Sequence, residues 1–262
     1  MNAMTDSSTE KPEFHNGPHG KIAYRKSEGD GPGMIWLGGF RSDMEGSKAE
    51  TLHQHAMETG QAFLRFDYSG HGMSEGKFEE GTISTWLADT LAVLDDLTDG
   101  PQILVGSSMG GWIALLVALA RPARIAGMIL IAPAPDFTET LMWAGFDQAA
   151  RHTLITQGIL KTPSDYSDEP DIITHALIED GRNNLVLDKK IPVTGPVRIL
   201  QGVQDPDVPF QHAIRVIDAV ESDDVHMLLV KAGDHRLSTD DDLARLTNVA
   251  SEVTKTIRSS GL

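Results

Sequence analysis

The sequence predicts an α/β protein with a mostly parallel central sheet and helices on both faces. Short apolar runs alternate with helical patterns of about ten residues or more, which is typical of strands joined by crossover helices. The chain has 262 residues, 40% of them hydrophobic, which suffices for one such domain with a large core. We therefore expect a single domain over residues 1–262, with one insertion described below.

The predicted elements follow one another in a regular order. Residues 14–31 place glycine and proline between two strand-like runs, which indicates a hairpin. Buried parallel strands are expected at the apolar runs 33–40, 62–68, 102–108, 127–133, 197–202 and 225–233. Helical patterns occupy the intervals between and after them, at 47–60, 82–97, 109–122, 209–220 and 240–259.

One interval is too long for a direct crossover. About sixty residues separate the strand run at 127–133 from the next run, whereas connections of this kind are usually much shorter. We expect residues 137–194 to form a small helical cap over the carboxyl ends of the strands, the edge where open α/β sheets bind ligands. Met142, Trp143 and Phe146 fit two interpretations equally, as the lining of an acyl pocket or as packing within the cap.

A glycine-rich turn joins the strand run at 102–108 to the following helix. It reads VGSSMGGW and fits the pattern Gly-x-Ser-x-Gly with Ser108 at its centre. Small residues are required two positions before and after a nucleophile on such a strained turn. Ser107 would need Val105 and Met109 at those positions, and both are too bulky. The pattern therefore predicts Ser108 as a catalytic nucleophile.

A serine nucleophile needs a base, and histidine is the usual one. His235 follows a strand run and a turn, which places it at the same sheet edge as Ser108. The acid is expected after the preceding strand, where Asp205 and Asp207 compete; Asp205 comes sooner and is preferred. Asp234 is interpreted as a turn-forming residue. The order serine, aspartate, histidine is that of α/β-hydrolases.

Two backbone N–H groups are predicted to form an oxyanion hole. Met109 opens a helix whose N-terminus favours developing negative charge, so its N–H is one donor. The loop after the first parallel strand contains Gly38-Gly39, which lets the backbone approach a substrate closely. The N–H of Phe40 is then the second donor.

Composition excludes several classes of function. A formal net charge of −16 argues against a nucleic-acid or anionic-membrane surface, and the absence of cysteine excludes disulfides and thiolate chemistry. The sequence has no apolar stretch that could span a bilayer and no secretory signal, so we expect a soluble cytoplasmic protein without stable membrane insertion. No metal-binding motif is evident, and neither a metal nor a cofactor is expected.

These motifs resemble the α/β-hydrolase superfamily over nearly the whole chain. The segments GGFRSDMEGSKA, RFDYSGHGMSEG, GSSMGGW, IPVTGPVRILQGVQDPDVP and DHRLS, with PSDYS at residues 163–167, are similar to the abhydrolase subfamily of the mitochondrial palmitoyl-protein thioesterase, also described as an acyl-glucuronide esterase. The resemblance implies Ser108 as nucleophile, Asp205 as acid and His235 as base. Many superfamily members have His-Gly before the oxyanion residue, whereas this chain has Gly38 in place of the histidine.

The expected activity is cleavage of carboxylic esters or thioesters through an acyl-enzyme on Ser108. The partner is then a small acyl ester or an S-acylated substrate. Two alternatives stay open: cofactor-free perhydrolysis or carbon–carbon hydrolysis on the same fold, and a non-catalytic small-molecule binding protein. The acyl-chain length, the leaving group and the oligomeric state are not readable from the sequence.

Overall fold

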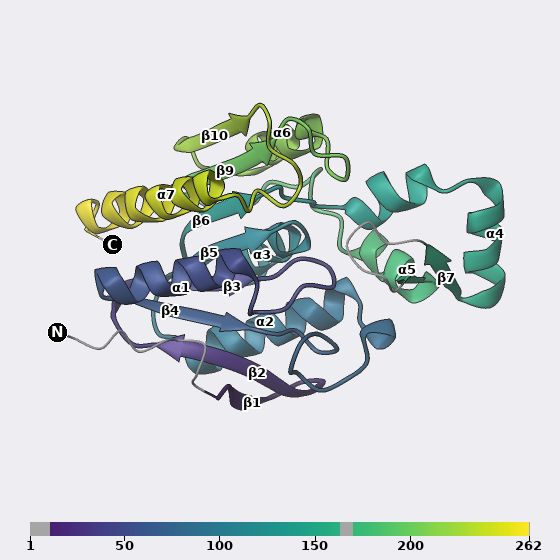
Figure 1. Cartoon of the computed structure of the whole chain (residues 1–262), viewed down its shortest axis with the longest axis horizontal. Helices are drawn as coiled ribbons and strands as arrows, with labels where there is room; N and C mark the ends of the chain where they lie inside the picture. The colour runs from purple at the N-terminus through teal and green to yellow at the C-terminus, as the bar shows by residue number, and fades with distance from the viewer. Residues whose placement is uncertain (1–10, 163–169, 262) are drawn as a thin grey trace.

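An eight-stranded sheet forms the centre of the molecule in a computed structural model, which describes residues 11–162 and 170–261 (Figure 1). The strands lie in the order β1-β2-β4-β3-β5-β6-β9-β10. Within this eight-stranded sheet only the pairs β1–β2 and β2–β4 are antiparallel, so the prediction of a mostly parallel sheet is confirmed. The bounds of the strands are β1 (Glu13–Gly17), β2 (Gly20–Ser27), β3 (Asp30–Leu37), β4 (Gln61–Phe66), β5 (Gln102–Ser107), β6 (Ile125–Ile131), β9 (Val197–Gly202) and β10 (Val225–Val230).

Helices cover both faces of this sheet, as predicted. One face carries α1 (Ser47–Thr59) and α7 (Asp240–Ser259), which lie side by side in Figure 1. The other face carries α2 (Ile83–Leu97), α3 (Met109–Ala120) and α6 (Phe210–Ala219). Two short 3₁₀ turns complete the layers, η2 (Phe78–Glu80) and η3 (Pro122–Arg124).

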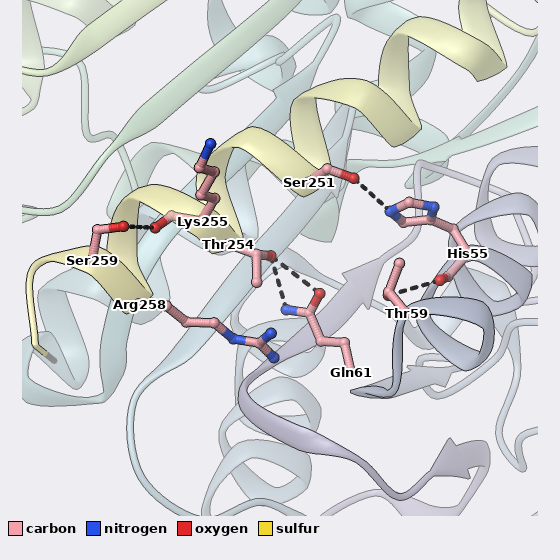
Figure 2. Close-up of a pocket in the computed structure, with 8 residues that line it drawn as sticks. All are labelled: His55, Thr59, Gln61, Ser251, Thr254, Lys255, Arg258 and Ser259. Carbon is pink, nitrogen blue, oxygen red and sulfur yellow. Dashed lines mark hydrogen bonds between the residues drawn. The ribbon is translucent and has the colours of Figure 1, made fainter.

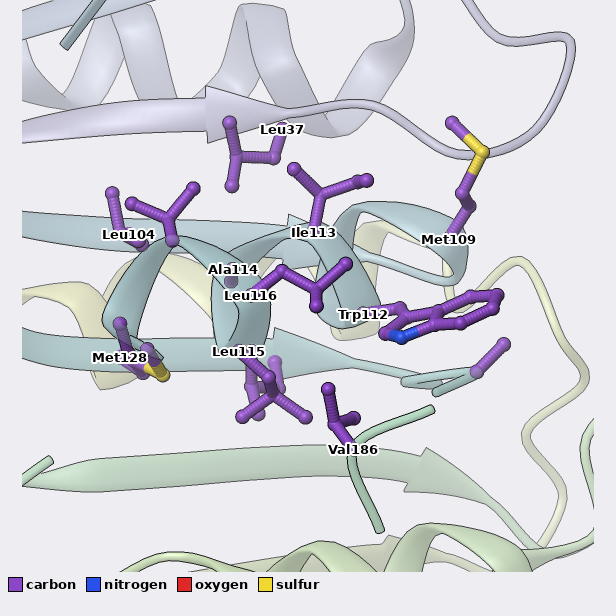
Figure 3. Close-up of a cluster of buried hydrophobic side chains, with 14 of the residues drawn as sticks. Leu37, Leu104, Met109, Trp112, Ile113, Ala114, Leu115, Leu116, Met128 and Val186 are labelled. Carbon is purple, nitrogen blue, oxygen red and sulfur yellow. The ribbon is translucent and has the colours of Figure 1, made fainter. Parts of the chain in front are cut away.

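The centre of the sheet is buried on both sides, which fixes the position of the turn between β5 and α3. Every residue of β5 is buried, and ten residues of α3 are buried as well. A helix that is apolar all round belongs inside a core. Figure 3 shows Trp112, Leu115 and Leu116 of α3 packed among side chains of neighbouring strands. The turn therefore stands on two rigid, well-packed elements.

The segment between β6 and β9, which we name the cap segment, stands apart from the sheet, beyond the carboxyl ends of the parallel strands (Figure 1). Its described elements are the π-helix η4 (Thr138–Trp143), α4 (Gln148–Gln157), β7 (Ile159–Thr162), β8 (Asp171–Thr174) and α5 (His175–Asn183). Besides these helices it holds β7 and β8, which pair as an antiparallel two-stranded sheet that the expectation of a helical cap did not include. Four-residue strands are too short for alternation to reveal them. Residues 163–167, which contribute to the resemblance above, lie outside the described residues.

No helix in the described ranges is both long and apolar enough to cross a bilayer.

Candidate active site

Ser108 occupies a strained turn between β5 and α3. Its backbone has φ 53° and ψ −116°, a conformation that residues with a side chain rarely adopt and that costs about 1–3 kcal/mol. The surrounding chain holds it from both sides. Its N–H donates to the carbonyl of Ile131 at 2.9 Å, and its own carbonyl accepts the N–H of Ala134 at 3.1 Å. The hydroxyl is thereby presented at the carboxyl edge of the sheet.

The glycines around Ser108 are required by close backbone approach. A Cβ at Gly106 would lie 2.4 Å from the carbonyl oxygen of Gly110. A Cβ at Gly110 would lie 2.0 Å from the carbonyl oxygen of Leu37, at the end of β3. Both distances are far inside van der Waals contact. The turn therefore accepts only glycine at the two positions that the pattern singles out.

His235 lies between Ser108 and Asp205. Its Nδ1 is 2.8 Å from Asp205 Oδ2, and its Nε2 is 3.0 Å from Ser108 Oγ. Because a carboxylate only accepts, Nδ1 carries the proton, and Nε2 is then free to accept the Ser108 hydroxyl proton. The structure thus brings together three residues that lie on separate loops, after β5, β9 and β10.

The Asp205 carboxylate is fully buried, and each of its two oxygens accepts two hydrogen bonds. Its Oδ2 accepts from His235 and from Gln201 Nε2, at 3.0 Å for the latter, and its Oδ1 accepts the N–H groups of Asp207 and Val208 at 2.9 and 2.8 Å. Burial by itself would raise the pKa of this carboxyl. The hydrogen bond and charge of His235, with the two backbone N–H groups, outweigh burial and lower the pKa. Asp205 is therefore ionised at neutral pH.

The competing acid, Asp207, has a different position. Its backbone N–H donates to Asp205, and its side chain is exposed at the rim of the cavity described below. Asp234, interpreted as a turn former, accepts the N–H of Leu237 at 2.9 Å through its side chain. The geometry therefore favours Asp205 over Asp207 as the partner of His235.

Within the described ranges, one group of side chains offers metal ligands at close range: Asp205, Asp207 and His235, whose ligand atoms lie within 4.8 Å of one another. The hydrogen bonds of Asp205 compete with such a use. Both of its oxygens already accept two hydrogen bonds each. This donor set suits a carboxylate that orients a histidine, so the group gives no independent reason to place a metal here.

The N–H groups of Phe40 and Met109 flank the serine. In the described part of the chain neither of them donates a hydrogen bond within the protein. A Cβ placed at Gly39 would lie 3.5 Å from Ser108 Cβ, which shows how closely the Phe40 loop approaches the serine. The Phe40 ring anchors this loop, with its centroid 4.9 Å from the ring of Phe78. Two backbone donors are thus available beside the hydroxyl.

A cavity of about 830 Å³ opens above these residues. One wall is apolar and is lined by Phe137, Leu141 and Met142, the last two from the π-helix η4. The polar lining includes Ser47 and Lys48 of α1 and Arg236. The cavity therefore has an apolar lining from the segment that follows β6 and a polar lining from α1 and the His235 loop.

The sequence left the role of three cap residues open, and the structure separates them. Met142 lines the cavity, whereas Trp143 and Phe146 do not and instead pack together with ring centroids 6.5 Å apart. The guanidinium groups of Arg151 and Arg182 lie over the Trp143 ring at 5.2 and 4.7 Å. Trp143 and Phe146 are thus packing residues of the cap segment.

A second cavity, of about 350 Å³, lies between α1 and α7, at the ends of these helices that point away from the cap segment (Figure 2). Its polar side chains bond one another, as in the contacts of Ser251 with His55 at 2.9 Å and of Gln61 with Thr254 at 3.0 Å. None of the predicted site residues lines it. Its cations, Lys255 and Arg258, stand near the C-terminus of α7, where they complement the helix dipole.

Two polar residues near the site were missed from the sequence. Gln201 is fully buried and donates to Asp205 and to the carbonyl of Val208, each at 3.0 Å. Lys48 reaches from α1 to the loop that carries His235 and donates to the carbonyl of Arg236. Neither position carries a sequence signal, because both contacts depend on how separate elements pack.

Comparison with known proteins gives a consistent set of matches. Residues 44–171 match the family described as serine aminopeptidase, S33. The mitochondrial palmitoyl-protein thioesterase ABHD10 of Mus musculus is 40% identical over 223 residues, 85% of this chain and 75% of that protein. A crystal structure of a putative hydrolase from Agrobacterium vitis S4 is 44% identical with a TM-score of 0.89, covering 93% of this chain and 98% of that one. The structure of mouse α/β hydrolase domain-containing protein 10 is 36% identical with a TM-score of 0.86, at the same coverage.

These matches overturn the predicted cytoplasmic location. The palmitoyl-protein thioesterases of mouse, cattle and human that the chain matches are all named as mitochondrial proteins. The cytoplasmic prediction was wrong because it depended on missing export and membrane signals, and such missing signals carry no positive information about a compartment.

Proposed function

We propose residue roles and a substrate class for this chain, which belongs to the α/β-hydrolase superfamily, in the subfamily of the palmitoyl-protein thioesterase ABHD10, and which hydrolyses ester or thioester bonds. The proposal rests on one observation, the continuous line of hydrogen bonds from Ser108 through His235 to Asp205. The relatives named as thioesterases favour hydrolysis over the alternative of a non-catalytic binding protein. Perhydrolysis and carbon–carbon hydrolysis stay predictions from the fold alone.

The first step is attack by the serine. His235 Nε2 takes the proton of Ser108 Oγ while the oxygen attacks the acyl carbonyl carbon. The distance of 3.0 Å between these atoms supports direct transfer. Asp205 keeps the proton on Nδ1 and stabilises the imidazolium that forms. Its lowered pKa supports this role, because a neutral acid would not stabilise a cation.

The developing oxyanion needs hydrogen-bond donors that are already in position before the serine attacks. The N–H groups of Phe40 and Met109 are the proposed pair, since each lies beside the serine without an internal acceptor in the described chain. Met109 adds the N-terminal end of α3, whose dipole favours negative charge. Loss of one such donor costs about 10²–10³ in kcat in comparable sites.

The tetrahedral intermediate then collapses. His235 gives its proton to the leaving oxygen or sulfur, the bond from this atom to the acyl carbon breaks, and Ser108 keeps the acyl group. Water enters, loses a proton to the same Nε2 and attacks the acyl-enzyme carbonyl. The acid leaves and the Ser108 hydroxyl is restored, so the cycle needs no redox partner.

The lining of the cavity supports an assignment of substrate parts. The apolar wall of Phe137, Leu141 and Met142 suits the acyl chain, and the polar lining suits the leaving group. We propose residues 137–194 as the cap that builds the acyl side. The cap is tied to the oxyanion loop by Arg41, whose Nη1 donates to the carbonyl of Pro170 at 2.8 Å. The relatives named as palmitoyl-protein thioesterases point to S-acylated substrates.

A fluorophosphonate probe tests the nucleophile. The wild type should be labelled at Ser108, and Ser108→Ala should lose both labelling and hydrolysis of p-nitrophenyl acetate. Ser107→Ala is the matched control, because it removes the same hydroxyl from the adjacent position and leaves the hydrogen bonds of the site in place. Equal labelling of Ser108→Ala and wild type would refute the assignment.

A substrate panel tests the class of leaving group and the acyl length. Nitrophenyl esters of rising chain length should be compared with an S-acyl peptide by kcat/KM. We expect the values to rise with chain length up to the capacity of the apolar wall and to fall beyond it. A flat dependence on chain length would contradict the assignment of that wall to the acyl group.

A further inference from the structure

The loop that carries the proposed base is short and packs against the core through the buried side chain of Leu237. It joins β10 to α7 and contains Leu237 at a positive φ of 45°. Its internal hydrogen bonds are local. Asp234 accepts the N–H of Leu237, and the Ser238 hydroxyl donates to the carbonyl of Arg236 at 3.0 Å. Local turns alone do not fix how the imidazole faces Ser108.

Asp205 bonds the His235 ring, and a second side chain, from α1, reaches the main chain of this loop. Lys48, in the first turn of α1, donates through Nζ to the carbonyl of Arg236 and to Ser238 Oγ, at 3.3 Å for the latter. The accepting carbonyl belongs to the residue that follows His235. Both Lys48 and His235 line the cavity. The contact therefore links α1 directly to the segment that sets the position of the imidazole.

The location of Lys48 is unfavourable for a cation on other grounds. The first turn of a helix carries positive partial charge, which disfavours lysine there. No carboxylate forms an ion pair with Lys48 among the described residues. The ammonium instead donates hydrogen bonds to a main-chain carbonyl and a hydroxyl. The contact with the Arg236 carbonyl therefore accounts for the position of the Lys48 side chain.

We propose that Lys48 is a positioning residue, whose ammonium holds the His235 loop so that the imidazole stays within reach of Ser108. This inference rests on the proposed function, because it concerns the same base. A hydrogen bond from an ammonium to a carbonyl is about twice as strong as one between neutral groups. Loss of the charge therefore loosens the loop that carries the base.

The surroundings of Lys48 make its charge sensitive to alkaline pH. Burial lowers its pKa to about 8, the Asp234 and Asp242 carboxylates oppose this shift, and the Arg236 guanidinium adds to it. The ammonium is present below this pH and is lost above it. The positioning effect is then expected to weaken as the pH rises through about 8.

The test measures the rate of fluorophosphonate labelling from pH 6 to 10, because labelling requires attack by Ser108 with loss of fluoride but no later hydrolysis of an acyl-enzyme. We expect the wild-type rate to fall on the alkaline side with an apparent pKa of about 8. Lys48→Met should be about ten- to a hundred-fold slower at pH 7 and should lack this alkaline fall, since a small displacement of a reacting group can cost 10²-fold. Lys48→Arg stays charged at all these pH values and should keep its rate at pH 9.

Controls separate the possible outcomes. Lys231→Met removes the same charge from an exposed position on the same loop and should match the wild type. A wild-type profile without an alkaline fall, or a fall that persists unchanged in Lys48→Arg, would overturn the proposal even if Lys48→Met folds poorly. A Lys48→Met variant that only raises KM in ester hydrolysis would overturn it as well, by indicating substrate binding. Labelling of Ser108→Ala at the wild-type rate would instead refute the proposed function.

Discussion

Replacing Asp205 by Asn should cost about 10⁴-fold in kcat. The carboxylate accepts four hydrogen bonds, two at each oxygen. An amide has one oxygen, so its NH₂ group must face two of these donors. If the oxygen stays with the backbone N–H groups, the NH₂ faces His235 and the imidazole adopts the tautomer with its proton on Nε2, which cannot accept from Ser108. In a triad of this geometry the wrong tautomer lowers kcat by about 10⁴, or about 5.4 kcal/mol in activation free energy.

The matched control is Asp207→Asn. It leaves the backbone N–H of Asp207 bonded to Asp205 and changes only an exposed side chain. An exposed substitution shifts energies by about 0.5 kcal/mol or less, so kcat should stay within a factor of about three. Both variants are assayed with p-nitrophenyl acetate, and thermal melting verifies folding, since each unpaired buried donor costs about 1–3 kcal/mol of stability. If Asp207→Asn loses turnover while a folded Asp205→Asn keeps it, the choice of acid is refuted.

Three further predictions follow from the geometry. Gly110→Ala should lower the free energy of unfolding in urea by about 3 kcal/mol through overpacking, while Gly145→Ala, where a Cβ meets open space, should change little. Met142→Trp should shift the chain-length optimum of ester hydrolysis toward short acyl groups, and Ile155→Trp, on an exposed part of the cap segment, should leave it unchanged. The lowered pKa of Asp205 stabilises the fold above the unfolded value of about 3.9, and this contribution is lost as the pH falls through the folded value. Urea titrations from pH 6 to 3 should therefore show a steeper loss of stability for wild type than for Asp205→Asn, and parallel curves would contradict the cause of the shift.

The order of strands and helices was predictable because each element carries a strong local pattern. The run at 102–108 has an apolar centre at residues 103–105 followed by Gly-Ser-Ser, and it forms β5 and the turn at Ser108. The glycines of that turn are readable because a Cβ at Gly106 or Gly110 would overlap backbone atoms. Where two backbone segments approach this closely, only glycine fits. The close approach is therefore visible in the sequence as a glycine at a fixed spacing from the serine.

The cap segment and the support of the site were less predictable. The π-helix η4 differs from an α-helix by a slight widening that apolar spacing does not reveal, and it carries Leu141 and Met142, which line the cavity. Lys48 has no signal because its contact with the Arg236 carbonyl spans 188 residues. A backbone carbonyl accepts from any lysine that reaches it, so only the packing of α1 against the His235 loop identifies the partner.

The distribution of the three residues over β5, β9 and β10 makes the site a reporter of tertiary assembly. Ser108 follows a central strand, whereas His235 follows the strand at the edge of the sheet. A refolding chain with intact helices but an undocked β10 holds a serine without its base. Pulses of fluorophosphonate during refolding would therefore mark only molecules that have completed the sheet to its edge, and circular dichroism, recorded in parallel, would time the earlier formation of helices.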